Sequence, residues 1–213
     1  MKYGESTFDI IYLLFAITCG IFIIIKSKHK IGYLMGIATL VLGIGDSFHL
    51  IPRVLNYFID KDFTIYLGIG KCITSITMTI FYMFMYYIYV LNYRARENKL
   101  VSAILWILCI TRIILCLMPQ NNWITDSSPF LWGIYRNIPF VILGLLITIY
   151  YHAERNRDST FQWIFLWIFL SFLFYIPVVV GADKIPMLGM LMLPKTICYI
   201  LIIISFLRKI KEI

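Results

Sequence analysis

The sequence predicts an all-α polytopic membrane protein, with seven transmembrane helices bundled into a single domain over residues 1–213. Hydrophobic residues make up 61% of the chain and charged residues 14%, whereas soluble domains are roughly 45–50% apolar. Apolar runs long enough for a bilayer, about 20 residues each, recur from end to end. The polar breaks between them are short, which favours antiparallel neighbours in one compact bundle.

Each predicted element is an apolar run that ends at a polar break. The predicted spans are residues 8–25, 31–52, 65–91, 100–118, 130–150, 161–181 and 187–207. They must be helical, because hydrocarbon offers the backbone no water to bond. The first run is expected to be a retained helix rather than a cleaved signal, since no small-residue cleavage site follows it. All five cysteines lie inside apolar segments and none forms a CxxC pair, which indicates packing rather than a disulfide framework.

Lysines and arginines give the predicted orientation. Eleven of them flank one side of the spans: Lys26, Lys28, Lys30, Arg94, Arg96, Lys99, Arg155, Arg157, Arg208, Lys209 and Lys211. The opposite side has Lys2, Lys61 and Lys184. By the positive-inside rule, the N-terminus is outside and the C-terminus is cytoplasmic, as expected for a multi-pass protein of a bacterial cytoplasmic membrane. The net charge of +8 is then a topology signal, and nucleic acid is not an expected partner.

Charged residues recur at one depth in the outer half of the predicted bundle. These are Asp46, Lys71, Arg112, Arg136 and Lys195, one on each of five helices. They lie about six to eight residues from the outer ends, or roughly 9–12 Å deep at 1.5 Å per residue. His49 and Arg53 follow Asp46 at i+3 and i+7, on one helix face. Such residues favour a bundle interior or a water-filled cavity over lipid.

The cations of this layer outnumber its acid, so an anion is expected to complete the pocket. Arg53, Lys71, Ser75, Arg112, Arg136 and Lys195 are the predicted ligand-binding residues. Arginine can hold a phosphate or a carboxylate in two-point fashion. Ser75 lies one turn below Lys71. No cofactor is predicted, and the expected ligand is a membrane lipid or an anionic small molecule.

Each of these residues also has a structural interpretation. Arg53, Arg112 and Arg136 could extend to lipid headgroups. Lys195 could satisfy the carbonyl that Pro194 frees. Asp46 and His49 could form a buried pair that fixes one helix to its neighbours, and the Ser75 hydroxyl could bond the carbonyl four residues earlier.

Several classes of chemistry fit the residues poorly. His49 is the one histidine at the outer level, and a zinc site usually needs three or four ligands, so no metal site is predicted. The chain thereby departs from seven-helix zinc hydrolases of the ceramidase and adiponectin-receptor type. A lysine in the seventh helix is also found in microbial rhodopsins, but Lys71 stands where their counter-ion carboxylate is expected.

Two stretches resemble lysoplasmalogenase-like bacterial membrane proteins. These are "GIATLVLGIGDSFHLIP" with the glycine-led helix after it, and "GAD" at 181–183 with the closing "LPKTICYILIIISFL". The resemblance implies that Asp46 and Asp183 are functional acids in hydrolysis of a lysolipid head-group linkage. The chain departs from that family in having seven predicted helices rather than eight and in its layer of lysine and arginine.

Three functions remain open at this point. An enzyme acting on an anionic amphiphile would use Asp46 as general base, with His49 transferring protons and Asp183 as a further catalytic acid. A receptor or sensor would bind the same ligand without chemistry, and its short cytoplasmic loops would require a partner membrane protein. A small-anion transporter fits less well, because no midplane site between repeats is visible.

Overall fold

The computed structural model describes residues 2–95, 98–125, 129–182 and 184–212, and all regular structure within these ranges is helical. The helices are α1 Lys2–Lys26, α2 Lys30–Phe58, α3 Thr64–Tyr93, α4 Lys99–Leu117, α5 Phe130–Ala153, α6 Ile164–Gly181 and α7 Met192–Glu212. Short 3-10 turns are η1 Pro119–Asn121, η2 Arg155–Arg157 and η3 Pro186–Leu191. The described part of the chain thus contains seven helices long and apolar enough to cross a membrane, as the sequence predicts.

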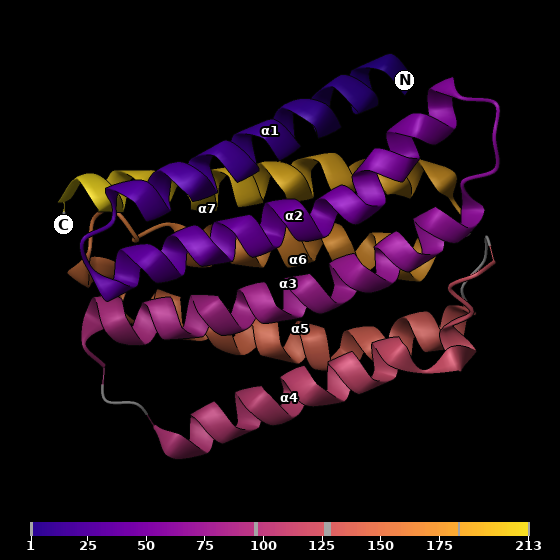
Figure 1. Ribbon diagram of the computed structural model, residues 1–213. Coiled ribbons are helices and arrows are strands. Elements are labelled where there is room, and N and C mark those ends of the chain that lie inside the picture. The colour runs from indigo at the N-terminus through magenta and orange to yellow at the C-terminus, as the bar shows by residue number, and fades with distance from the viewer. Residues whose placement is uncertain (1, 96–97, 126–128, 183, 213) are drawn as a thin grey trace.

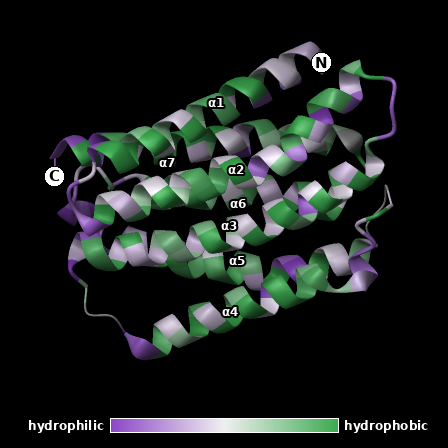
Figure 2. Ribbon diagram, in the orientation of Figure 1, coloured by the Kyte–Doolittle hydropathy of each residue, from purple (hydrophilic) through white to green (hydrophobic). Residues whose placement is uncertain are grey.

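The helices form one closed bundle in which chain neighbours are also spatial neighbours (Figure 1). Each helix packs on the next along the chain, and α7 returns to pack on α1. The two chain ends lie at opposite ends of the bundle. Helix α3 is the most buried of the seven, because it also contacts α5 across the interior. Hydrophilic residues concentrate at the two ends of the bundle and hydrophobic ones along its length (Figure 2).

Glycines bring α2 close to both of its neighbours. A Cβ on Gly36 or Gly43 would press on Ile24 or Ala16 of α1, so these two glycines form a close-packing surface. On the other side, a Cβ on Gly70 of α3 would overlap the backbone carbonyl of Phe48. This contact brings the backbones of α2 and α3 together at the level of His49.

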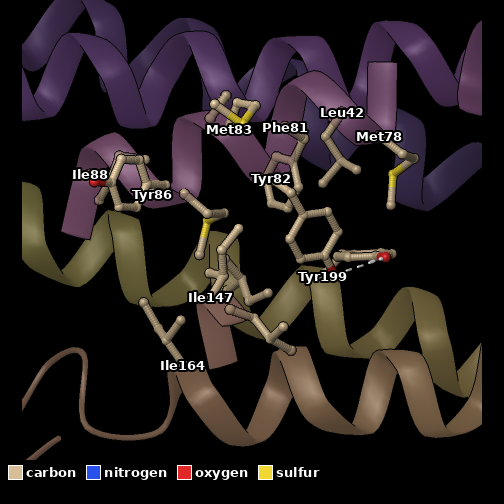
Figure 3. Close-up of a cluster of buried hydrophobic side chains, with 14 of the residues drawn as sticks. Leu42, Met78, Phe81, Tyr82, Met83, Tyr86, Ile88, Ile147, Ile164 and Tyr199 are labelled. Atoms are coloured by element: carbon tan, nitrogen blue, oxygen red, sulfur yellow. Dashed lines mark hydrogen bonds between the residues drawn. The ribbon is translucent and has the colours of Figure 1, made fainter. Parts of the chain in front are cut away.

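The core is rich in aromatic side chains, and Figure 3 shows part of it around Tyr82 and Tyr199. Tyr82 of α3 is fully buried, and its hydroxyl lies 3.5 Å from that of Tyr199 on α7 and 3.2 Å from that of Ser171 on α6. The Tyr82 ring packs edge-on against Phe140 of α5, with ring centroids 5.2 Å apart. Four helices therefore meet around this tyrosine.

Several helix ends differ from the sequence prediction by five residues or more. Helix α1 begins at Lys2 rather than at residue 8, and α7 ends at Glu212 rather than at residue 207. Helix α2 continues past Pro52 to Phe58, because Arg53 and Tyr57, one turn apart, both donate hydrogen bonds to Glu5 of α1 and fix the extra turns. Helix α7 begins at Met192 rather than at residue 187, because the preceding residues form the 3-10 turn η3.

Candidate functional site

A cavity of about 330 Å³ lies in the half of the bundle where α5 begins and α6 ends. Four cations from four helices line it: Lys71 of α3, Arg112 of α4, Arg136 of α5 and Lys195 of α7. Among the described residues, no aspartate or glutamate lines it. We call it the basic cavity. Met78 and Phe140 belong both to its wall and to the aromatic core, so the core closes its inner end.

Arg112 is the most deeply buried of the four cations, at 2% exposure. Its guanidinium carbon stacks 3.3 Å from the centre of the Phe140 ring. One nitrogen, Nη2, lies 3.5 Å from Asn137 Oδ1, which is long for a hydrogen bond. The other two nitrogens, Nε and Nη1, are buried without a hydrogen-bond partner in the described structure. A buried charge with unmet donors is a costly arrangement for a protein.

Arg136 is held by the turn that follows α4. Its Nη1 donates a 2.7 Å hydrogen bond to Asn121 Oδ1, and its guanidinium carbon lies 4.5 Å from the centre of the Trp123 ring. Asn121 is fully buried and donates to carbonyls at the end of α4, including that of Leu115 at 2.6 Å. Trp123 donates to the Cys116 carbonyl at 2.7 Å. The turn thus fixes the direction of the Arg136 side chain into the cavity wall.

The two lysines differ in their surroundings. Lys195 lies over aromatic rings, 4.6 Å from the centre of the Tyr175 ring and 5.6 Å from that of the Tyr199 ring. The negative charge of Asp46 attracts the Lys195 ammonium without a direct contact. Lys71 is more exposed and lies where the basic cavity joins a second cavity. Among the described residues, neither lysine takes part in an ion pair within 4.0 Å.

A second cavity adjoins the basic cavity, toward the end of the bundle where α1 and α3 begin and α2 ends. Its volume is about 540 Å³, and its wall includes Glu5, Arg53, Tyr57 and the turn η3. His49, Lys71 and Met192 line both cavities, so the two adjoin each other. We call the second one the vestibule. It lies between the basic cavity and the end of the bundle.

The charged residues and the histidine of "GIGDSFHLIPR" differ in their contacts. His49 lines both cavities, and its Nδ1 is buried without a hydrogen-bond partner in the described structure. Asp46 does not line the basic cavity, and it accepts a 2.6 Å hydrogen bond from Tyr12 of α1. Arg53 forms a 3.0 Å ion pair with Glu5 in the vestibule wall.

The remaining predicted site residues have separate positions. Ser75 lines the basic cavity, and its hydroxyl donates a 2.7 Å hydrogen bond to the Lys71 carbonyl, as in the structural interpretation of this serine. Asp183 lies outside the described residues. Its neighbour Ala182 lines the basic cavity.

Sequence reasoning missed the neutral residues that shape the cavity and the acids of α1. Asn121, Trp123, Asn137 and Tyr175 are wall or support residues with no charge to mark them. Glu5 of α1 was seen only as part of an acidic outer end, and its pairing with Arg53 depends on the packing of α1 against α2.

Compared with protein-family models, with curated proteins and with solved structures, the chain matches none of them.

Proposed function

We propose that this chain is an integral membrane protein, with its N-terminus outside and its C-terminus in the cytoplasm, that binds the head group of an anionic amphiphile in the basic cavity. The head group is a phosphate or a carboxylate. It reaches the cavity from the outer half of the membrane, because the vestibule opens at the end that the positive-inside rule assigns to the outside. A volume of about 330 Å³ lies within the range of small-molecule sites, roughly 300–1,000 Å³.

The observation that carries the proposal is the unmet charge of Arg112. A guanidinium that is 2% exposed and has two unpartnered nitrogens is expensive to keep, by several kcal/mol for an ion in a low dielectric. An anion beside Arg112 would offset this charge, and accepting from one of the two unpartnered nitrogens would add a charge-assisted hydrogen bond of about 1.5–3 kcal/mol. Lys71 and Lys195 add positive charge to the same wall. The ligand thus supplies the counter-charge that the cavity lacks.

Binding is tested with dodecyl phosphate added to the purified protein in phosphatidylcholine nanodiscs. We expect it to bind and raise the unfolding temperature, whereas dodecanol, with the same chain and no charge, does not. Lys71→Gln should weaken binding by about tenfold or more, since a hydrogen bond to a charged group is lost. Lys61→Gln is the matched control, because it removes an exposed lysine that lines neither cavity.

Equal responses to dodecyl phosphate and dodecanol would refute anion recognition. The proposed orientation is tested separately, with cysteines placed at Lys61 and Arg208 and a maleimide that cannot cross the membrane. In intact cells we expect labelling at position 61 and protection at position 208. The reverse pattern would overturn the orientation and the outer-leaflet source of the ligand.

A second candidate is hydrolysis of the bound head group, with His49 as the base. The observation that favours it is the His49 imidazole, which lines both cavities with Nδ1 unpartnered. His49 would take a proton from water, the water oxygen would bond to the phosphorus or carbonyl carbon, and the leaving alcohol oxygen would take that proton as its bond breaks. Asp46 is less suited to act as the base, because it does not line the cavity and is bonded to Tyr12.

Turnover is measured on the same nanodisc sample with a lysophospholipid, by mass spectrometry of released head group and alcohol. The hydrolase predicts release that His49→Gln abolishes while dodecyl phosphate still binds. Binding without any release from a panel of lysophospholipids would exclude the hydrolase and favour a receptor or sensor, which would act through a partner chain.

A further inference from the structure

An apolar groove lies between α5 and α6 at the same end of the bundle as the basic cavity. Its volume is about 260 Å³, and isoleucine and valine form all of its wall except Asn137 and Tyr175. We call it the α5–α6 groove. Ile138 and Ile176 on its two sides are 50% and 41% exposed, so the groove opens to the outer surface of the bundle. In the proposed orientation that surface faces the hydrocarbon of the outer leaflet.

The groove and the basic cavity share part of their walls. Asn137, Tyr175 and Val179 line both. The Tyr175 hydroxyl donates a 2.8 Å hydrogen bond to Asn137 Oδ1, the atom that Arg112 Nη2 approaches at 3.5 Å. One side of this polar pair therefore faces the cations, and the other side faces the isoleucines and valines of the groove. The shared wall is where a basic site meets an apolar one.

We propose that the α5–α6 groove holds the hydrocarbon chain of the amphiphile whose head group occupies the basic cavity, an inference that rests on the proposed function. Any exposed apolar helix face contacts lipid in a membrane, but this one is concave and adjoins a cluster of four cations. A molecule with an anionic head and a single apolar chain matches both halves at once.

The apolar lining of the groove favours a hydrocarbon chain as its ligand. Burial of apolar surface provides about 25 cal/mol per Å², so an isoleucine and valine groove favours methylene groups over water. A water-soluble anion would leave the groove unused and would need only the vestibule. The affinity of an alkyl phosphate should thus depend on how much chain reaches the groove.

The test compares hexyl phosphate with dodecyl phosphate in phosphatidylcholine nanodiscs. Ile138→Trp should obstruct the groove with a bulky ring, and Ile149→Trp is its matched control on α5, at a more exposed position (63%) outside the groove. Both variants share the same bilayer, so unspecific partitioning of the longer chain cancels between them. We expect the dodecyl-to-hexyl affinity ratio to fall about tenfold or more in Ile138→Trp and to stay at the wild-type value in Ile149→Trp.

A dodecyl phosphate carrying a diazirine near its chain end gives an independent readout, read by mass spectrometry of the cross-linked peptides. The inference predicts labels on the groove residues of α5 and α6, competed away by unlabelled dodecyl phosphate. Labels elsewhere, or equal affinity ratios in both tryptophan variants, would overturn the groove inference and leave head-group binding intact. Failure of both phosphates to bind the wild-type protein would overturn the proposed function as well.

Discussion

Replacement of Arg112 by methionine should stabilise the ligand-free protein while abolishing anion binding. The guanidinium is buried, stacked on Phe140, and poorly hydrogen-bonded to Asn137. A desolvated cation–π contact is worth about 2 kcal/mol or more, and a 3.5 Å hydrogen bond adds little. Desolvation of the charge costs several kcal/mol. Methionine has a similar length, fills irregular gaps and carries no charge, so we expect a gain of about 1–3 kcal/mol.

The matched variant is Arg136→Met, for which the opposite sign is expected. Arg136 is the described donor to Oδ1 of the fully buried Asn121, and its loss leaves that oxygen unsatisfied. An unsatisfied buried acceptor costs about 1–3 kcal/mol. The same substitution should therefore change the stability in opposite directions at the two positions. Arg136 makes a short hydrogen bond to Asn121, whereas the contact of Arg112 with Asn137 is long.

The assay is thermal unfolding in dodecyl maltoside, an uncharged detergent, because an anionic detergent would itself fill the site. Arg112→Met should unfold at a higher temperature than the wild type, Arg136→Met at a lower one, and dodecyl phosphate should no longer raise the midpoint of Arg112→Met. Loss of one charge-assisted hydrogen bond, about 1.5–3 kcal/mol, corresponds to at least about tenfold in affinity. A lower midpoint for Arg112→Met with binding preserved would refute the reasoning and make Arg112 a structural cation.

Three further predictions concern stability. Burial raises the pKa of Asp158, but hydrogen bonds from Lys209 and Asn92 outweigh it and hold the pKa below its ordinary value; the stabilisation is therefore complete above about pH 4 and lost as the pH falls through the lower folded pKa. The check is thermal unfolding of the wild type and Asp158→Asn between pH 2.5 and 6. The wild type should have the higher midpoint at pH 6, and the two midpoints should converge in acid. A difference that stays constant with pH would contradict this. Gly70→Ala should cost about 1–3 kcal/mol by forcing α2 from α3, whereas Gly4→Ala, with open space around it, should not destabilise; equal midpoints would disprove the close approach. Tyr12→Phe should cost about 1–3 kcal/mol by removing the described donor to Asp46, and an unchanged midpoint would show that this bond is dispensable.

The helices could be predicted closely because their signal is local. Hydrophobic runs, short polar breaks and the need for internal backbone hydrogen bonds specify seven helices without any tertiary information. The exceptions lie where tertiary contacts act, as in α2, whose last turns are held by the bonds of Arg53 and Tyr57 to Glu5. Depth counting also brought Lys71, Arg112, Arg136 and Lys195 to one level, and these four line one cavity.

Depth could not reveal which neighbouring side chains each residue contacts. Asp46, His49 and Arg53 are close in sequence, yet only His49 lines the basic cavity, because the other two bond to Tyr12 and Glu5 of α1. The same limit hid the support of Arg136 by Asn121, which comes from a turn after another helix.

The sequence by itself therefore determined the seven apolar helices and the level of the charges along them, because hydrophobicity and helical rise act along one dimension. Only the tertiary structure decided which charges are neutralised and which are not. Arg53 has an acid beside it and Arg136 an amide, whereas Arg112 has two buried donors with no partner among the residues that the structure describes. That distinction depends on how the helices are rotated and packed against each other, and it is the basis of the proposed anion site.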